Sequence, residues 1–222
     1  MNTFRTCLFD LDGTLINTID DLAAACEQVL AEFDLGNADG SAVYQREAYY
    51  RFVGNGVRKL VERAFEGRGQ QTVPEQAHAR FLQLYNANCK VKTAPYDGII
   101  PLLDALKARG VKLGVVTNKP EAQARFLADA FFAEYGFCCV YGSTTGRPNK
   151  PDPTSLYLAL SDCAATASET LFVGDSNVDV QTAHNGDLVC AGAAWGFRGR
   201  EELCREGAEI VVDHPLELLQ YF

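Results

Sequence analysis

The sequence predicts an α/β fold in which a doubly wound parallel sheet carries an inserted α-helical segment. After Pro95, nearly all-apolar runs of strand length alternate with segments of helical periodicity, which is typical of right-handed βαβ units with helices on both faces of the sheet. Residues 17–90, which follow the first apolar run, show helical periodicity and no strand pattern. We therefore expect a core formed by residues 1–16 and 91–222, with residues 17–90 inserted into it as a helical domain.

Each element is justified by its local pattern. The first strand, residues 4–10, is an apolar run that ends at an acidic turn. Within the insertion, apolar residues recur on one helical face in segments 20–33 and 57–65, and a third helix begins near Thr72 with Pro74 at an early position. The later elements are predicted as helix 99–106, strand 111–117, helix 121–132, strand 137–141, helix 154–163, strand 170–174, helix 178–185, strand 188–194 and edge strand 210–212.

Composition excludes several classes of function. The 222 residues include 20 Lys and Arg against 29 Asp and Glu, and a net charge of −9 disfavours non-specific binding to nucleic acid or anionic membranes. No run approaches the ~18 apolar residues of a membrane-spanning helix, and the first apolar run meets Asp10 and Asp12 too soon for a signal peptide. The eight cysteines form no C-x-x-C pair and are interpreted as free buried thiols of a cytoplasmic protein.

Polar side chains follow the predicted strands at the edge where an open α/β sheet binds its ligands. Several carboxylates in one cleft repel each other unless a cation joins them, and oxygen ligands favour a hard ion such as Mg²⁺. An aspartate can also act as a covalent nucleophile, while a hydroxyl and an ammonium can position and neutralise a phosphoryl group. The residues concerned are Asp10, Asp12, Thr117, Asn118, Lys150, Asp175 and Asp179.

These stretches resemble, in chain order, the four motifs of the haloacid dehalogenase-like hydrolase superfamily: Asp10-Leu-Asp12-Gly-Thr14, Thr117, Lys150 and Gly174-Asp175-Ser176-x-x-Asp179. The resemblance implies that Asp10 is the nucleophile that becomes phosphorylated, and that Asp12 is the general acid and then the general base. It also implies that Thr117 and the backbone amide of Asn118 hold phosphoryl oxygens. Lys150 is expected to pair with the nucleophile and with the transferred group.

The same resemblance implies a magnesium site. Mg²⁺ would be held by Asp10, the backbone carbonyl of Asp12 and Asp175, while Asp179 would orient metal-bound water. Haloacid dehalogenases proper do not need an acid at the position of Asp12, so its presence favours a phosphatase or a phosphomutase.

Two further stretches resemble phosphoglycolate phosphatases and their relatives: Val53-Gly54-Asn55-Gly56-Val57 and Thr117-Asn118-Lys119-Pro120. The helical insertion resembles the cap that closes over the site in part of the superfamily, which implies that Gly54, Asn55 and Gly56 contact the substrate. The resulting expectation is a Mg²⁺-dependent phosphatase, monomer or homodimer, acting on a small phosphorylated metabolite, with 2-phosphoglycolate as the first candidate. A pyrophosphatase, 5′-nucleotidase or phosphomutase would use the same machinery, and a phospho-receiver signalling domain is the alternative from another class.

Ordinary structural interpretations also stay open for single residues. Asp175 and Asp179 could cap the helix that follows them, and the glycines at 54 and 56 could form a turn after a helix. Lys119 and Arg198 are interpreted as surface charges, and Trp195 as part of the core or of a cleft wall.

Overall fold

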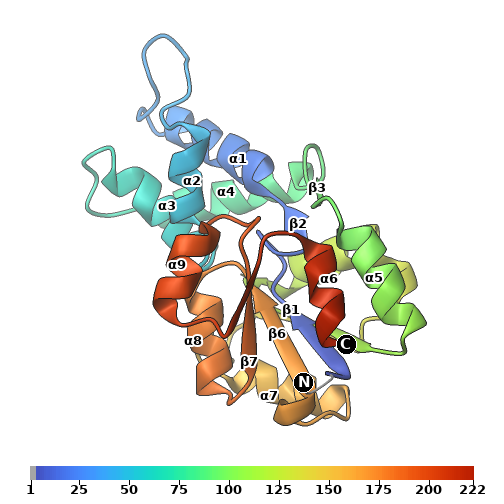
Figure 1. Cartoon of the computed structure of the whole chain (residues 1–222). Coiled ribbons are helices and arrows are strands. Elements are labelled where there is room, and N and C mark those ends of the chain that lie inside the picture. The colour runs from blue at the N-terminus through green and yellow to red at the C-terminus, as the bar shows by residue number, and fades with distance from the viewer. Residues whose placement is uncertain (1–3) are drawn as a thin grey trace. The chain divides into compact units, whose positions relative to one another are not determined.

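The computed structural model describes residues 4–222, which form two compact units (Figure 1). One unit comprises the chain up to Asn17 together with Pro95–Phe222, and the other comprises Thr18–Ala94. The chain passes from one to the other at two short strands, β2 (Ile16–Asn17) and β3 (Ala94–Pro95). The second boundary thus lies four residues later than the sequence analysis places it, because 95 − 91 = 4.

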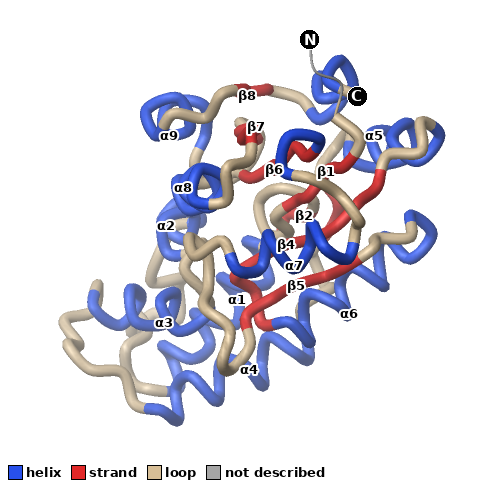
Figure 2. Tube along the Cα trace, turned by 90° about the horizontal axis from the view of Figure 1, so that it is seen from below, coloured by secondary structure: helices blue, strands red, loops and turns tan. Residues whose placement is uncertain are grey.

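The first unit is built on a parallel sheet. Among residues 4–222, six strands form it in the order β5-β4-β1-β6-β7-β8, with parallel pairing throughout (Figure 2). Central β1 pairs with β4 on one side and β6 on the other, so that Phe9 lies opposite both Val115 and Val173. The predicted fold class is confirmed. The strands are β1 (Thr6–Phe9), β4 (Lys112–Pro120), β5 (Cys139–Ser143), β6 (Thr170–Gly174), β7 (Val189–Ala193) and β8 (Ile210–Val212).

Helices cover both faces of this sheet (Figure 2). Helices α7, α8 and α9 share one apolar cluster with the strands, which includes Leu156, Val180 and Leu203 together with Phe172 of β6. The other face is covered by α5 and α6. Burying apolar side chains on both faces explains why the strand sequences are almost wholly apolar. The helices are α5 (Ile99–Ala108), α6 (Glu121–Phe132), α7 (Thr154–Asp162), α8 (Asn177–Asn185) and α9 (Gly199–Glu206), with short 3₁₀ turns at Ala133–Tyr135, Ala167–Glu169 and Pro215–Tyr221.

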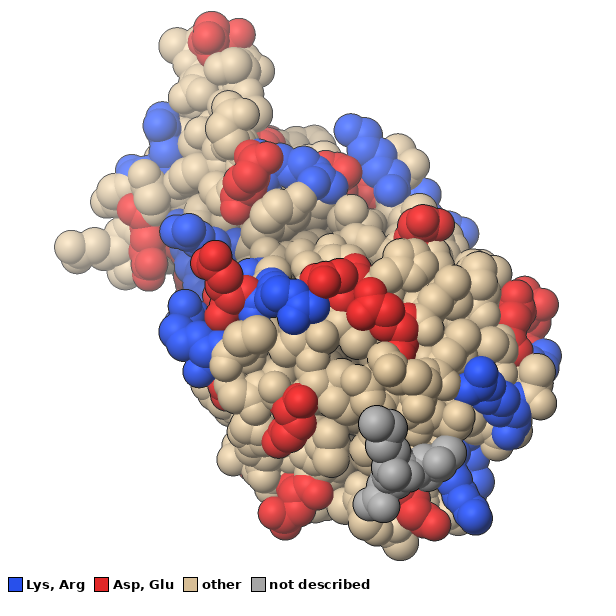
Figure 3. Space-filling view, in the orientation of Figure 1, with Lys and Arg blue, Asp and Glu red and all other residues tan. Residues whose placement is uncertain are grey.

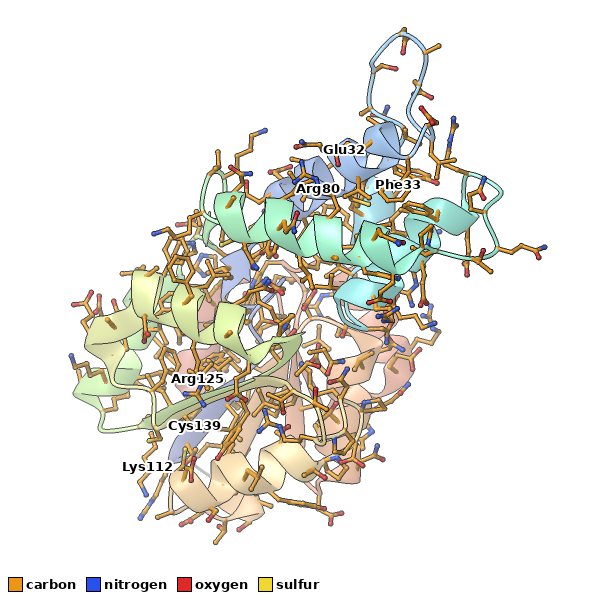
Figure 4. All side chains as sticks on the ribbon, turned by 180° about the vertical axis from the view of Figure 1, so that it is seen from behind. Glu32, Phe33, Arg80, Lys112, Arg125 and Cys139 are labelled. Carbon is orange, nitrogen blue, oxygen red and sulfur yellow. The ribbon has the colours of Figure 1, made fainter. Side chains whose placement is uncertain are left out.

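The helical unit holds α1 (Ile19–Glu32), α2 (Arg46–Phe52), α3 (Val57–Glu66) and α4 (Glu75–Asn88). Its interior is rich in aromatic rings, and Tyr49 meets Phe52 edge to face with ring centroids 5.5 Å apart. On its surface, Arg80 of α4 bridges Glu32 of α1 at 2.7 Å (Figure 4). Since both of these side chains are more than a third exposed, the ion pair contributes little to stability.

Two of the helices were not expected. Helix α2 buries only Tyr49, and α9 buries only Leu203, so neither carries the apolar stripe on which the periodicity argument depends.

Two strands differ from their predicted bounds. Strand β5 begins at Cys139 rather than at residue 137, and β4 continues through Thr117 to Pro120 rather than ending at Thr117. The second difference places Lys119 within a strand.

None of the eight cysteines, all of which lie within residues 4–222, forms a disulfide, and six of them are buried as expected. The prediction is wrong for Cys138 and Cys204, which are exposed. Cys138 directly precedes β5, which lies at an edge of the sheet, and Cys204 lies on α9, which buries little of its surface. Burial raises the pKa of the Cys7 thiol in β1 well above its ordinary value, which keeps it protonated.

The surface carries charges of both signs. On the face that Figure 3 shows, Lys and Arg side chains are interspersed with Asp and Glu rather than gathered into one broad basic patch. Among residues 4–222, no helix has the length and apolar character needed to cross a membrane.

Asp21 fastens the end of the helical unit to its first helix. The carboxylate is buried, and it accepts hydrogen bonds from Lys92 N at 3.0 Å, Thr93 N at 2.9 Å and Thr93 Oγ1 at 2.8 Å. We expect Asp21→Ala to lower the free energy of unfolding by about 2–3 kcal/mol, because it leaves buried donors without an acceptor. Urea denaturation measures this change. Asp39→Ala, which removes an exposed carboxylate that accepts hydrogen bonds from Ser41, is the control, and an equal effect of both substitutions would contradict the prediction.

Candidate active site

Three buried carboxylates meet where β1 and β6 end. Asp10 follows β1 directly, and its backbone N–H donates to Val173 O in β6 at 2.8 Å. Asp175 follows β6, and Asp179 lies in the first turn of α8. Each of the three offers one oxygen, and these oxygens lie within 4.8 Å of one another. Because the strands are parallel and in register, residues 165 positions apart in the chain (175 − 10) come together at one edge of the sheet.

Lys150 joins two of these carboxylates. Its buried Nζ lies 2.9 Å from Asp10 Oδ1 and 2.6 Å from Asp179 Oδ1, and it sits 5.5 Å from the centre of the Phe172 ring. Burial by itself lowers the pKa of Lys150, but the charges of Asp10 and Asp179 outweigh burial and raise it above its ordinary value. The ammonium is therefore charged at neutral pH and compensates part of the acidic cluster.

Asn118 holds the backbone of Lys150 in place. Its side-chain Nδ2 donates to Lys150 O at 3.0 Å, and its Oδ1 accepts from Lys150 N at 2.8 Å. This reciprocal pair ties the loop before α7 to the end of β4. The neighbouring Thr117 is buried, and its hydroxyl acts to lower the pKa of the Asp10 carboxyl group, an effect smaller than that of burial.

Asp179 has two structural contacts. Ser176 donates to Asp179 Oδ2 from its backbone N at 3.0 Å and from its Oγ at 2.6 Å, which forms a capping box at the start of α8. The other oxygen, Oδ1, accepts from Lys150. The helix-capping interpretation therefore holds for Asp179, and the same residue also positions the ammonium beside Asp10.

Asp175 is held by a tightly packed loop. Its Oδ2 accepts from Phe197 N at 2.7 Å, and its Oδ1 accepts from Thr14 Oγ1 at 3.2 Å. Gly13 has φ +90°, and a Cβ at this position would lie 2.4 Å from Asp175 Oδ2. A glycine is required here both by the backbone conformation and by the space that the carboxylate takes.

The electrostatics of the cluster call for a cation. Burial, opposed by Lys150 and reinforced by Asp179, raises the pKa of Asp10 to about 6. Burial and the charges of Asp179 and Asp10 raise the pKa of Asp175 well above its ordinary value. In addition, Asp10 Oδ1 is buried and accepts no hydrogen bond, since its contact with Lys150 pairs charges without hydrogen-bond geometry. Converging oxygen ligands, uncompensated charge and an unsatisfied oxygen together fit a metal ion.

Asp12 has a partner that the sequence analysis missed. Lys119 Nζ donates to Asp12 Oδ1 at 2.9 Å and to Oδ2 at 3.0 Å, and the Lys119 side chain is only 2% exposed. The interpretation of Lys119 as a surface charge is wrong, because β4 continues past Thr117 and carries this lysine inward. Arg198 is also largely covered, with 15% of its side chain exposed, and lies 3.8 Å from Glu202.

The glycine-rich stretch belongs to the helical unit, between α2 and α3. Gly54 and Gly56 have φ values of +114° and +86°, and Gly56 is the N-cap of α3. Asn55 Oδ1 accepts from Arg63 at 2.6 Å, and Arg63 also donates to Phe52 O at 2.8 Å. The loop is thus shaped by positive φ angles and fastened to α3 by one guanidinium.

Some site residues had a signal in the sequence and others had none. Ser176 and Asp179 show the i, i+3 spacing of a capping box. Trp195, expected in the core or a cleft wall, donates from Nε1 to Thr14 O at 3.0 Å and so supports the loop after β1. Phe197 contacts Asp175 through the backbone N–H of Phe197. Because almost any residue type offers a backbone N–H, the sequence gives no signal for this contact.

Comparison with known proteins places the chain in a family. The model of the haloacid dehalogenase-like hydrolases matches residues 7–193. The chain belongs to this family. The match includes most of β1, all of β4 and β6, and the loops that carry the acidic cluster, and it excludes the alternative of a phospho-receiver domain.

Similar proteins refine the class. The chain is 35% identical over 220 residues to a phosphoglycolate phosphatase of Pseudomonas putida, covering 97% of this chain and 78% of that protein. It is 37% identical over 216 residues to a phosphoglycolate phosphatase of Rhodospirillum rubrum, covering 94% and 87%. The crystal structure of a predicted phosphoglycolate phosphatase from Haemophilus somnus superposes with a TM-score of 0.86 at 27% identity, covering 99% of this chain and 98% of that chain. This haloacid dehalogenase-like hydrolase is therefore a phosphatase, an enzyme that acts on a phosphorylated small substrate.

Proposed function

We propose that the chain hydrolyses 2-phosphoglycolate to glycolate and phosphate through a phosphorylated Asp10. The observation that carries the proposal is the placement of Asp10: a buried carboxylate at the end of the central strand, beside an ammonium and a hydroxyl. The substrate is suggested by the relatives at 35% and 37% identity, which are named phosphoglycolate phosphatases.

In the first step, a carboxylate oxygen of Asp10 attacks phosphorus. The bond from phosphorus to the glycolate oxygen breaks, and Asp12, which is protonated in the substrate complex, gives its proton to that oxygen. Thr117 and the backbone amide of Asn118 hold the phosphoryl oxygens, and Lys150 compensates their charge.

In the second step, water attacks the phosphorus of the aspartyl-phosphate. Asp12, now a carboxylate, takes a proton from this water, the bond between Asp10 and phosphorus breaks, and phosphate leaves. The nucleophile returns to its starting form, and no redox change or further reactant is needed.

The acidic cluster would hold the metal ion, which we propose to be Mg²⁺. The ligands would be Asp10, Asp175 and the backbone carbonyl of Asp12, and the Asp179 carboxylate would lie beside them. When bound, Mg²⁺ would offset the negative charge of the carboxylates and of the phosphoryl group, so that an anionic nucleophile can approach an anionic substrate. Thr14 and Phe197 N orient Asp175 toward this role.

The helical unit is proposed to act as the cap. Its loop at Gly54, Asn55 and Gly56 is proposed to contact the substrate, since both glycines have positive φ angles and no side chain that would keep a ligand from the backbone. Arg63 would hold this loop in shape. Closure of such a cap would exclude water from the phosphoryl-transfer step.

Metal dependence gives a direct test of this function. We expect the purified protein to release phosphate from 2-phosphoglycolate in the presence of Mg²⁺, and EDTA to lower the rate by about 100-fold or more. Added Mg²⁺ in excess of EDTA should restore the rate. Full activity after chelation, or no phosphate release from 2-phosphoglycolate under any of these conditions, would contradict the proposal.

A further inference from the structure

The active site of the α/β unit contains two buried ammonium groups with different partners. Lys150 pairs with Asp10 and Asp179 and so lies at the nucleophile. Lys119 pairs with both oxygens of Asp12 and so lies at the residue that handles the leaving group in the proposed function. In the proposed function, the two cations therefore lie toward opposite ends of the bond between phosphorus and the leaving oxygen.

Burial of the Lys119 ammonium costs free energy, and the contact with Asp12 offsets part of this cost. Its side chain is 2% exposed, and an ammonium taken out of water needs an anion in contact with it. The Asp12 side chain is 13% exposed, which leaves part of this ion pair accessible to solvent. When Asp12 engages the leaving oxygen of a substrate, a second anion beside Lys119 would keep the buried ammonium compensated.

The chemistry of the substrate supplies such an anion at the right distance. Proton transfer brings a carboxyl oxygen of Asp12 to within about 3 Å of the leaving oxygen, and Lys119 Nζ lies 2.9 Å and 3.0 Å from the two oxygens of the same group. In 2-phosphoglycolate, a single methylene separates the leaving oxygen from the carboxylate. This short separation allows the carboxylate to reach Lys119 when Asp12 engages the leaving oxygen.

We propose that Lys119 binds the carboxylate of the substrate and selects phosphate esters that carry an anionic group next to the ester-bearing carbon. This inference rests on the proposed function and adds a specificity-determining residue to it. It also gives a role to the lysine that directly follows Thr117 and Asn118 in the sequence. A chain of net charge −9 repels a substrate that carries both a phosphate and a carboxylate at long range, and a local cation offsets this repulsion.

The test compares two substrates of similar size. One is 2-phosphoglycolate, and the other is 2-hydroxyethyl phosphate, in which a neutral alcohol replaces the carboxylate. We expect the unmodified enzyme to prefer 2-phosphoglycolate in kcat/KM, and Lys119→Met to reduce that preference by about 10- to 100-fold, since a charge-assisted contact is lost with one substrate only. Any loss from a misplaced Asp12 affects both substrates alike and cancels in the ratio.

Controls separate specificity from stability. Lys112→Met makes the same substitution at the other end of β4, where Lys112 Nζ donates to Cys163 O and Ala164 O (Figure 4), and it should leave the ratio unchanged. Lys119→Gln keeps a donor for Asp12 but removes the charge, so it should also lower the ratio even if the methionine variant folds poorly. Lys119→Arg keeps the charge and should retain a preference for 2-phosphoglycolate.

Each outcome decides the inference. If the Met and Gln variants lower kcat/KM for both substrates by the same factor, Lys119 only holds Asp12 and the inference is wrong. An unmodified enzyme that hydrolyses both substrates equally well would overturn it too, while leaving the phosphatase mechanism intact. Failure of the proposed function would be distinguishable, because the unmodified enzyme would then release no phosphate from either substrate.

Discussion

Asp10→Asn is expected to lower kcat for 2-phosphoglycolate by at least about 10⁴-fold, because an amide cannot form the phosphorylated intermediate. The substitution keeps the size of the side chain. It also leaves Lys150 with an anionic partner, since Asp179 Oδ1 lies 2.6 Å from its Nζ. The loss should therefore occur without unfolding, and steady-state phosphate release together with thermal denaturation measures both properties.

A matched control tests whether the loss of activity is specific to position 10. Asp129→Asn makes the same change at an exposed position of α6 and should retain full activity. If Asp10→Asn turns over at a rate near that of the unmodified enzyme, Asp10 is not the nucleophile. A variant that has lost both activity and a cooperative unfolding transition would show instead that Asp10 is required for the fold.

Asp12→Asn is expected to lower kcat for 2-phosphoglycolate by about 10²- to 10⁴-fold, because both the departure of glycolate and the attack of water lose their proton-transfer group. The effect should depend on the leaving group. With p-nitrophenyl phosphate, the leaving group needs no proton, so only the second step should be slowed. Rapid mixing should then show a burst of p-nitrophenol close to one equivalent per site, followed by slow turnover.

Loss of the burst would count against this assignment. If Asp12→Asn slows the first turnover of p-nitrophenyl phosphate as much as that of 2-phosphoglycolate, Asp12 does not act as the acid to the leaving group. The Lys119→Met variant provides a comparison, since it removes the contact that holds Asp12 but keeps the carboxyl group itself.

The acidic cluster could be predicted from the sequence because it depends on topology. Once β1 and β6 are assigned as parallel strands, Asp10 and Asp175 must share one edge of the sheet. The order of the motifs along the chain and the family resemblance then supply the chemistry. The insertion could be predicted from helical periodicity, since its helices α1 and α3 carry apolar stripes.

The pairing of Lys119 with Asp12 could not be predicted in this way. The two residues are 107 positions apart, and a lysine next to a proline after an apolar run is an ordinary surface pattern. Its burial follows from the extra length of β4, which depends on pairing with β5 near Ser143 rather than on local sequence. Helices α2 and α9 were missed because each buries only one side chain, so tertiary contacts rather than periodicity determine them.

The central claim is that Asp10 carries the phosphoryl group between the two steps. It can be measured with the Asp12→Asn variant and p-nitrophenyl phosphate: the reaction is stopped in acid during the burst, the protein is digested with pepsin in acid, and its peptides are analysed by mass spectrometry. The account predicts that the mass of one phosphoryl group is added at Asp10, and that no such addition occurs when Asp10→Asn is combined with Asp12→Asn. A burst with Asp10 unmodified, or a phosphoryl group on a different residue, would contradict it.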